Sequence, residues 1–423
     1  MNKDNLLEIL LDQKESFNRE RYMIERDINL QPYLSTSLVV IISGARRCGK
    51  SSLLYLIKQK LKLNDSEYCY CNLDDERIIA NDTILDSIYR LHIERHQTEP
   101  VFFFDEIQSI PRWEKFINRM YEQGRKIFVT GSNSSLLSSE ISTSLTGRNK
   151  VIEIFPFSFI EYCRYIKHNY SVSELSTKQR AFLMADLNKY MEMVGFPVVA
   201  REQNMELVSW WFQDILYRDI ISRFHITQTL EIKQIALYLL SNIGKLFSYS
   251  TLQSIAGIKS VSSVKTYLDY LEMSYMLFYL KKFDYSVKKQ IMNSRKVYAL
   301  DNALCNTLGF HFSENKGRLM ENLVFVELKR RRKEIFYYSG KYECDFVIRQ
   351  GIEITEAIQV VYNLNEENEK RELAGLKLAM SDLHIQKGIV LYYEKDSKIT
   401  INDDTIEMLP LYRWLLEPVE LKN

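Results

Sequence analysis

The sequence predicts an α/β fold at its N-terminal end, built on a parallel sheet, then a helical region and a second α/β region. Three observations predict this. Short apolar runs such as "LVVII" and "VFFF" alternate with helical patterns up to about residue 155, which is typical of a parallel sheet covered on both faces. The alternation stops near Pro156, and an α/β pattern resumes at about residue 295. We therefore expect three domains, with boundaries at 1–156, 157–290 and 291–423.

The bulk composition is that of an ordinary globular protein. Of the 423 residues, 46% are hydrophobic and 26% are charged, and 56 basic residues nearly balance 55 acidic ones. This balance produces no overall field toward nucleic acid or membrane, so a nucleic-acid role would rest on a local patch. The N-terminus is too charged for a signal peptide, no apolar run approaches the ~20 residues of a membrane span, and the scattered cysteines suggest reduced thiols. We expect a cytoplasmic protein without a membrane partner.

The elements of the first domain follow from their periodicity. Residues 5–28 have apolar side chains at helical spacing among charges, which predicts an amphipathic lead-in helix. The strands are expected in "LVVIISG", "EYCYCN", "VFFFDEI" and "KIFVTG", and the intervening helices begin at "KSSLLY", "TILDSI" and "WEKFIN". Their near-continuous apolar character predicts strands that are buried on both faces.

The stretch "SGARRCGKSS" fits the pattern G-x-x-x-x-G-K-[ST] without a mismatch, after a strand and before a helix. In that context backbone N–H groups cradle phosphates, Lys50 reaches the β and γ oxygens, and the Ser51 hydroxyl binds Mg²⁺. A glycine-rich turn with a chance lysine is the weaker alternative. We expect a nucleotide to contact Gly44, Ala45, Arg46, Arg47, Cys48, Gly49, Lys50, Ser51 and Ser52.

Two acids follow the buried strand "VFFF". Asp105 lies at the carboxyl end of the strand, where ligands bind open α/β sheets, and it is expected to hold Mg²⁺ together with Ser51. Glu106 is placed to orient or deprotonate the attacking water. The alternative, a solvated strand end, is less compatible with the phosphate-binding loop.

Polar residues also end the strand "KIFVTG". Thr130, Ser132 and Asn133 are candidates to contact the γ-phosphate or to position water, and we include Asn133 among the nucleotide contacts. Ordinary turn chemistry explains them equally well. Arg148 is a candidate arginine finger, acting on a neighbouring subunit, with a solvated surface arginine as the alternative.

These motifs together resemble the archaeal-type AAA+ ATPases. The resemblance is carried by "IISGARRCGKSSLL", "FFFDEIQSIPRWE", "VTGSNSSLLSSEISTSLTGR" and "EIFPFSFIEY", and it extends over almost the whole chain. It implies an ATPase core, a winged helix and a C-terminal nuclease-like domain. It also implies that Arg46 and Arg47 belong to an extended phosphate loop, that Asp105 and Glu106 are the Walker B pair, and that Arg148 closes the core.

The order of elements in residues 247–284 predicts a winged helix-turn-helix, with a recognition helix at about 261–273. Its candidate groove-facing residues are Ser262, Ser263, Lys265 and Tyr267, and the candidate phosphate contacts are Lys259, Lys281 and Lys282. A lid or protein-contact role is equally compatible. The run "KRRRK" at 329–333 either neutralises phosphates or ends a helix favourably.

The last region resembles the PD-(D/E)XK nuclease fold, in which carboxylates hold divalent metals that activate water. The resemblance places Glu321 on a helix, Asp345 on a strand, and Gln359 where a second acid is expected. Val361 replaces the expected lysine, and Glu356 falls on the opposite strand face from Gln359. We therefore expect a degenerate nuclease site, and a domain that binds DNA or protein without cleaving.

We thus expect an ATPase of the AAA+ type with ATP and Mg²⁺ as cofactors, in which Lys50, Glu106 and Arg148 are catalytic. Double-stranded DNA and a protein both remain open as partners, and a homo-oligomer is compatible with the sequence. One alternative is a nucleotide-gated switch without significant turnover. The other is a metal-dependent DNA nuclease under ATP control.

Overall fold

A computed structural model describes residues 2–19, 22–134, 145–171, 175–193, 195–310, 316–363, 366–393 and 405–417. The chain divides into two compact units, residues 1–155 and 156–423, and each is described by itself. None of the helices in these ranges is both long and apolar enough to cross a membrane. All six cysteines are free and buried.

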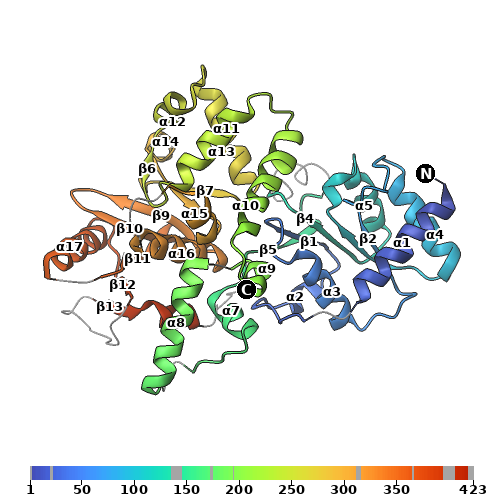
Figure 1. Cartoon of the computed structure of the whole chain (residues 1–423), viewed down its shortest axis with the longest axis horizontal. Coiled ribbons are helices and arrows are strands. Elements are labelled where there is room, and N and C mark those ends of the chain that lie inside the picture. Colours follow the sequence, from blue (N-terminus) through green and yellow to red (C-terminus); the bar gives the residue numbers. More distant parts are fainter. Residues whose placement is uncertain are drawn as a thin grey trace. The chain divides into compact units, whose positions relative to one another are not determined.

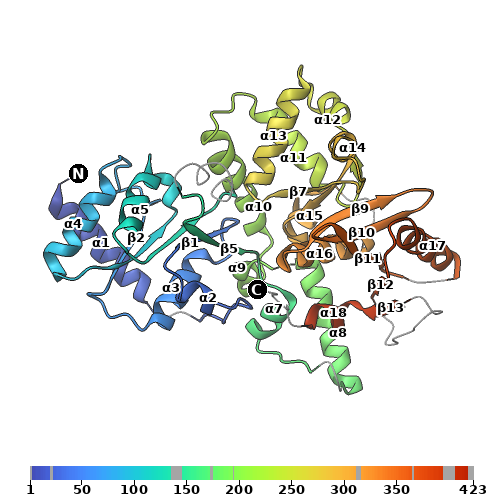
Figure 2. The same cartoon turned by 180° about the vertical axis from the view of Figure 1, so that it is seen from behind.

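The first unit is built on a five-stranded parallel sheet with strand order β2-β3-β4-β1-β5 (Figures 1 and 2). Its strands are β1 (Val39–Gly44), β2 (Tyr68–Asn72), β3 (Val101–Asp105), β4 (Ile127–Gly131) and β5 (Asn149–Ile154). Its helices are α1 (Lys3–Asn18), α2 (Gln31–Leu34), α3 (Lys50–Leu61), α4 (Ile84–His96) and α5 (Trp113–Glu122), with a 3-10 turn at Ile107–Ser109.

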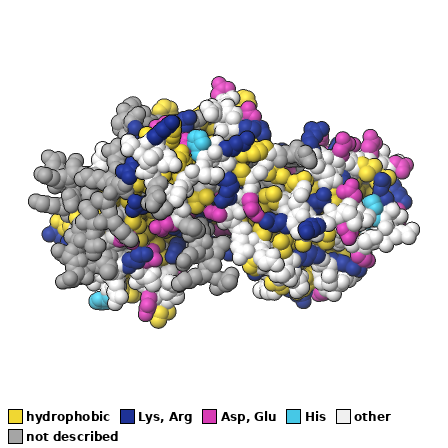
Figure 3. Space-filling view, turned by 90° about the horizontal axis from the view of Figure 1, so that it is seen from below, with side chains coloured by type: hydrophobic (Ala, Val, Ile, Leu, Met, Phe, Trp, Pro, Cys, Tyr) yellow, Lys and Arg dark blue, Asp and Glu magenta, His cyan; other side chains and the backbone are white. Residues whose placement is uncertain are grey.

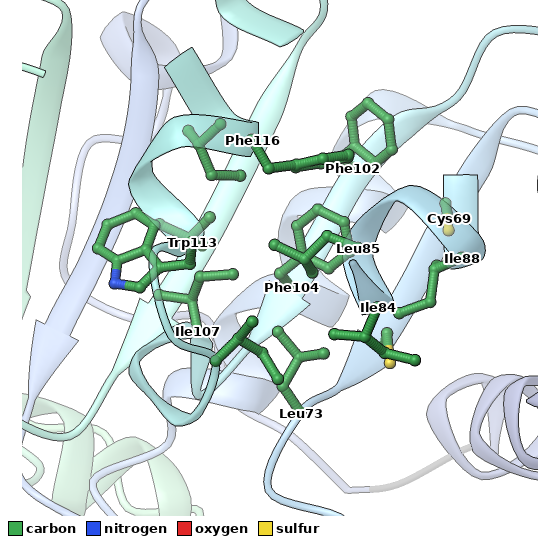
Figure 4. Packing of buried hydrophobic residues seen from close by; sticks show 14 of the residues in the cluster. Cys69, Leu73, Ile84, Leu85, Ile88, Phe102, Phe104, Ile107, Trp113 and Phe116 are labelled. Carbon is green, nitrogen blue, oxygen red and sulfur yellow. The ribbon is translucent and has the colours of Figure 1, made fainter. Parts of the chain in front are cut away.

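Both faces of this sheet are covered, as the sequence predicts. On one face, side chains of α1, α4 and α5 pack against alternate strand residues such as Phe102 and Phe104. Figure 4 shows these two rings beside Trp113 and Phe116 of α5. On the other face, α2 and α3 pack against Phe103 and its neighbours. This period-two alternation is the direct consequence of strand geometry.

The lead-in helix is shorter than the periodicity predicts, because α1 ends at Asn18 and residues 22–30 contain no regular structure. The helix packs along the edge strand β2. There the side-chain amide of Gln13 accepts a hydrogen bond from the N–H of Asn72 at 2.8 Å and donates one to its carbonyl at 3.1 Å. Phe17 stacks on Tyr70 of the same strand, with ring centroids 3.9 Å apart.

The second unit begins with helices and contains a three-stranded sheet of order β6-β8-β7. The helices are α7 (Phe159–Tyr165), α8 (Thr177–Met193), α9 (Pro197–Glu202), α10 (Glu206–Gln213) and α11 (Thr229–Leu240), with a π-helical segment at Asp214–Ser222. The sheet and its helices are β6 (Leu246–Phe247), α12 (Tyr249–Ala256), α13 (Val261–Met273), β7 (Leu277–Leu280), α14 (Val287–Met292) and β8 (Arg295–Ala299). Because β8 pairs with both β6 and β7, this sheet extends across the domain boundary expected at residue 290.

The remainder of the second unit is a mixed five-stranded sheet of order β13-β12-β11-β10-β9. Its elements are α15 (Asn302–Leu308), α16 (Lys316–Arg330), β9 (Glu334–Ser339), β10 (Glu343–Gln350), β11 (Glu353–Val361), α17 (Glu366–Asp382), β12 (Lys387–Tyr392), β13 (Thr405–Pro410) and α18 (Leu411–Leu416). The strands β9, β10 and β11 are antiparallel, whereas β11, β12 and β13 are parallel. A buried cluster joins α17 to one face of this sheet, and Phe325 of α16 lies near Phe346 of β10.

Candidate functional site

The loop after β1 needs glycine at both ends. Gly44 has φ 156°, and a Cβ at this position would lie 2.1 Å from the carbonyl oxygen of Ile154 on the neighbouring strand β5. Gly49 has φ 103° and caps the N-terminus of α3. Between them Ala45 and Cys48 are buried, whereas Arg47 is exposed. The loop therefore leaves the sheet in close contact with backbone and turns directly into a helix N-terminus.

The side chain of Lys50 is folded back beneath this loop. Its ammonium donates to the carbonyl of Ala45 at 3.0 Å and lies 3.4 Å from Oε1 of Glu106, and the side chain is only 4% exposed. Burial by itself would lower the pKa of Lys50, but the negative groups around the ammonium, with Glu106 the strongest and Asp105 among them, together raise it. The result is a fixed positive charge at the N-terminus of α3.

An arginine that sequence reasoning missed also holds the loop. Arg26 donates to the carbonyl of Cys48 at 2.9 Å and to the carbonyl of Phe155, the residue after β5, at 2.6 Å. The residue is 9% exposed. No pattern in the charged lead-in stretch distinguishes it from its basic neighbours, so it could not be selected from the sequence.

Asp105 is buried at the carboxyl end of β3 and is 3% exposed. Its carboxylate accepts hydrogen bonds from the hydroxyls of Thr130, Ser51 and, at 3.4 Å, Tyr70. Burial and then the charge of Glu106 raise its pKa, against the opposing effect of those hydrogen bonds. The raised pKa means that the negative charge of Asp105 is unfavourable where it lies, and a nearby cation would offset this cost. The Asp105 carboxylate and the Ser51 hydroxyl therefore fit a magnesium ion.

Glu106 has a left-handed backbone, with φ 53° and ψ 51°, a conformation that non-glycine residues adopt at a cost of about 1–3 kcal/mol. Its N–H donates to the Thr130 hydroxyl at 3.0 Å. Its carboxylate accepts from the Gln108 amide at 2.6 Å and from the N–H of Ser132 at 3.2 Å. Burial would raise the pKa of Glu106, but the charge of Lys50 and these donors lower it. Glu106 is therefore held as a carboxylate.

The remaining predicted nucleotide contacts lie at the same end of the strands, and they differ in their exposure to solvent and in the groups that they contact. Asn133 is buried, and its main-chain carbonyl accepts from the Ser43 hydroxyl at 3.2 Å. Arg46 lies 3.7 Å from the carboxylate of Asp74. Ser51 is exposed and Ser52 is half-buried on the first turn of α3.

Arg148 lies at the opposite end of the strands, where β1 and β5 begin. It precedes Asn149, which pairs with Val39 at the start of β1, whereas the phosphate-binding loop follows the end of β1. Its guanidinium bonds to the carboxylate of Glu122 at 2.9 Å and also to the side chain of Asn118. Arg148 therefore does not reach the loop of its own chain.

In the second unit, the three residues of the expected degenerate nuclease site converge. The Asp345 N–H donates to Oε1 of Gln359 at 3.3 Å, and the Gln359 amide donates to Glu372 at 2.6 Å. Glu321 and Asp345 both contact Lys296 of β8, at 3.1 and 3.2 Å. Sequence reasoning missed Lys296, although a lysine within the apolar strand "KVYAL" is a signal, since buried lysines are found paired.

The candidate recognition helix has the expected bounds, but Tyr267 does not face outward. It is 8% exposed, and its hydroxyl donates to Gln228 at 3.1 Å. Tyr267 therefore packs into the helical core because the helix buries one face against its neighbours, and the prediction that it faces a groove is wrong. Lys265 and Ser262 are exposed. In the run at 329–333, Arg330 and Arg331 point inward to Glu327.

A family model described as an AAA domain matches residues 36–163, and two models each described as a domain of unknown function match residues 184–315 and 316–414. An uncharacterised protein of Methanocaldococcus jannaschii is 36% identical over 431 residues, covering 97% of this chain and 94% of that protein. An uncharacterised protein of Haemophilus influenzae is 30% identical over 426 residues, covering 96% and 100%.

Matches among solved structures include the RuvB Holliday junction branch migration motor of Thermotoga maritima, with a TM-score of 0.29 at 16% identity, covering 65% of this chain and 87% of that chain. Cdc6p of Pyrobaculum aerophilum has a TM-score of 0.29 at 13% identity, covering 74% and 98%. The AAA-domain match at residues 36–163 contains all five strands of the parallel sheet, β1 to β5.

Proposed function

Because the chain belongs to the family of these two full-length relatives and carries an AAA domain, we propose that it binds ATP with Mg²⁺ and hydrolyses it. The observation that carries the proposal is the convergence of Lys50, Ser51, Asp105 and Glu106 where β1 and β3 end. Lys50 would grip the β and γ phosphates, and Ser51 and Asp105 would hold the metal, which supplies positive charge to the phosphate oxygens. Glu106, held as a carboxylate, would orient and accept a proton from the attacking water.

The direct test of nucleotide binding is Lys50→Ala, with Lys62→Ala as the matched control because Lys62 is an exposed lysine at the end of the same helix. We expect ATP affinity measured by calorimetry to fall at least tenfold in Lys50→Ala and to stay unchanged in the control. Equal affinity of native protein and Lys50→Ala would refute the proposal.

Glu106→Gln separates an ATPase from a nucleotide-gated switch. The substitution keeps the shape of the side chain but removes the proton acceptor, so phosphate release should fall at least a hundredfold while ATP affinity is retained. Unchanged phosphate release in Glu106→Gln would exclude Glu106 as the base. A native protein that binds ATP but releases no phosphate would favour the switch.

Arg148 is proposed to act on a second copy of the chain, and its place at the far edge of the sheet supports this. In that case Lys50→Ala and Arg148→Ala are each inactive alone, but mixing them pairs an intact Arg148 with an intact loop. We expect the mixture to regain part of the native phosphate release. No recovery, in a mixture that sedimentation shows to be assembled, would contradict the role.

We further propose that residues 157–290 include a lid and a winged helix that binds double-stranded DNA. The connection between β7 and β8 supports this, because Lys288 and Lys289 are exposed there beside four exposed apolar side chains: Tyr285, Val287, Ile291 and Met292. Basic groups contact phosphates, and exposed apolar groups are uncommon without a partner. On the face drawn in Figure 3, Lys and Arg side chains are interspersed with Asp and Glu side chains.

DNA binding is testable by fluorescence anisotropy with a labelled duplex at two salt concentrations. Replacing both Lys288 and Lys289 with Glu should weaken binding at least tenfold, and native affinity should fall steeply with salt. If the native protein does not bind the duplex with ATP or without it, the same surface is assigned to a protein partner. Cleavage of the duplex is not expected, because the carboxylates of the terminal region are occupied by a lysine.

A further inference from the structure

Lys296 lies at the centre of three carboxylates contributed by two other elements. Its ammonium is 2.6 Å from Oε1 of Glu343, 3.1 Å from Oε1 of Glu321 and 3.2 Å from Oδ1 of Asp345, and the side chain is 3% exposed. Glu321 belongs to α16, whereas Glu343 and Asp345 belong to β10. The lysine itself belongs to β8 of the three-stranded sheet. One buried ammonium therefore links three separate elements.

The carboxylates are oriented toward this ammonium by further hydrogen bonds. The Tyr298 hydroxyl, two residues along the same strand face as Lys296, donates to Oε1 of Glu321 at 2.7 Å. The Val360 N–H donates to Oδ2 of Asp345 at 3.0 Å, which leaves Oδ1 directed at the lysine. Burial alone would lower the pKa of Lys296, but the negative groups around it raise it well above its usual value. The ammonium is therefore charged although it is buried.

A divalent metal, which the nuclease resemblance implies, does not fit this arrangement. Metals such as Mg²⁺ and Ca²⁺ bind oxygens at about 2.0–2.6 Å, whereas these oxygens surround a nitrogen at 2.6–3.2 Å. With Lys296 in place, the described residues include no group of three or more His, Cys, Asp or Glu side chains that is arranged to hold a metal ion. The Gln359 amide, at the position expected for an acid, is bonded to Glu372 and to the Asp345 N–H.

We propose that the ammonium of Lys296 takes the place of a divalent metal at Glu321, Glu343 and Asp345, so that these carboxylates form a latent metal site that opens only when the lysine is removed. In the native chain this ion cluster fastens β8 to α16 and β10. The segment just after β7 is fastened to β9 of the mixed sheet, because the Phe283 N–H donates to the Tyr337 carbonyl at 2.8 Å and the Tyr337 N–H to the Lys281 carbonyl at 3.0 Å. Both ends of the β7–β8 connection are thereby anchored.

Mn²⁺ titration followed by electron paramagnetic resonance tests the proposal in nucleotide-free protein. All variants carry Asp105→Asn, which removes the metal ligand expected in the first unit. We expect the parent chain to take up no Mn²⁺ that depends on Asp345. Lys296→Ala should bind one Mn²⁺ per chain at least tenfold more tightly than the parent, and adding Asp345→Asn should abolish this gain. Lys377→Ala, at an exposed lysine of α17, is the matched control and should gain nothing.

Two results would overturn the proposal: Asp345-dependent Mn²⁺ binding in the parent chain, or a folded Lys296→Ala that binds none. Because Lys296→Ala leaves buried carboxylates unpaired, it is expected to melt at a lower temperature than the parent, and Mn²⁺ should restore part of that loss. If it fails to fold, the double variant Lys296→Met/Glu343→Gln removes one charge of each sign and keeps Glu321 and Asp345. The same two outcomes then decide the question.

Discussion

Arg26 offers the sharpest test of how the phosphate-binding loop is held. Its guanidinium makes hydrogen bonds of 2.9 and 2.6 Å to the carbonyls of Cys48 and Phe155, and the residue is only 9% exposed. A hydrogen bond involving a charged group contributes about 1.5–3 kcal/mol. Losing both in Arg26→Met should therefore lower the free energy of unfolding of the first unit by about 3 kcal/mol or more.

The functional effect should be separable from the effect on stability. For a unit of this size, 3 kcal/mol corresponds to a fall of about 6–12 °C in melting temperature. Well below that temperature the variant is folded, but the Cys48 carbonyl, one residue before Gly49, has lost its anchor. We expect ATP to bind about tenfold more weakly, measured by calorimetry at 15 °C. Arg26→Lys, which retains the charge and one donor group, should lose roughly half as much stability.

Arg90→Met on α4 is the control, because it removes an exposed arginine from the same unit. Its melting temperature should change by less than about 2 °C, as is usual for surface substitutions. If Arg26→Met matched this control in both melting temperature and ATP affinity, the assigned role of Arg26 would be wrong.

Three further predictions concern the phosphate-binding end of the first unit and the ion cluster around Lys296. Thr130→Val removes the hydroxyl that donates to the Asp105 carboxylate and accepts from the Glu106 N–H. Phosphate release should therefore fall at least tenfold while the circular dichroism spectrum is unchanged. Gly44→Ala places a Cβ 2.1 Å from the Ile154 carbonyl oxygen, so the melting temperature should fall far more than in Gly124→Ala, where φ is also positive but no atom lies within 4 Å. Burial and the charge of Asp345 raise the pKa of Glu321 from 4.5 to about 7. The folded state then binds this proton more tightly than the unfolded state, so about 3 kcal/mol of stability is lost as the pH rises from below 4.5 to above 7. Urea unfolding over this pH range should show a loss that is smaller by this amount in Glu321→Gln than in native protein, because Asp301, whose pKa burial raises to about 6, contributes to both. Equal curves would contradict the prediction.

The sequence predicted the first unit well because its signals are local. Continuous apolar runs specify buried parallel strands, and the carboxyl ends of such strands meet at one edge. That rule alone brings Asp105 and Thr130 to the phosphate-binding loop. It also places Arg148, which precedes a strand, at the opposite edge.

The partners that come from distant elements could not be predicted. Tyr70 reaches Asp105 because β2 lies beside β3, and its ring looked like any other apolar side chain of a strand. Lys296 reaches Asp345 because the three-stranded sheet lies against the mixed one, whereas the family pattern directed attention to Val361. In both cases the contact depends on packing between elements, which no spacing along the chain encodes.

The pairing of Gln13 with Asn72 has a consequence for the behaviour of shortened chains. An edge strand presents unpaired N–H and C=O groups that can template the addition of a strand from another molecule. Here α1 lies along β2, and its glutamine amide saturates one residue of that edge. A fragment that begins after Asn18 would uncover β2, and we expect it to precipitate through intermolecular strand pairing.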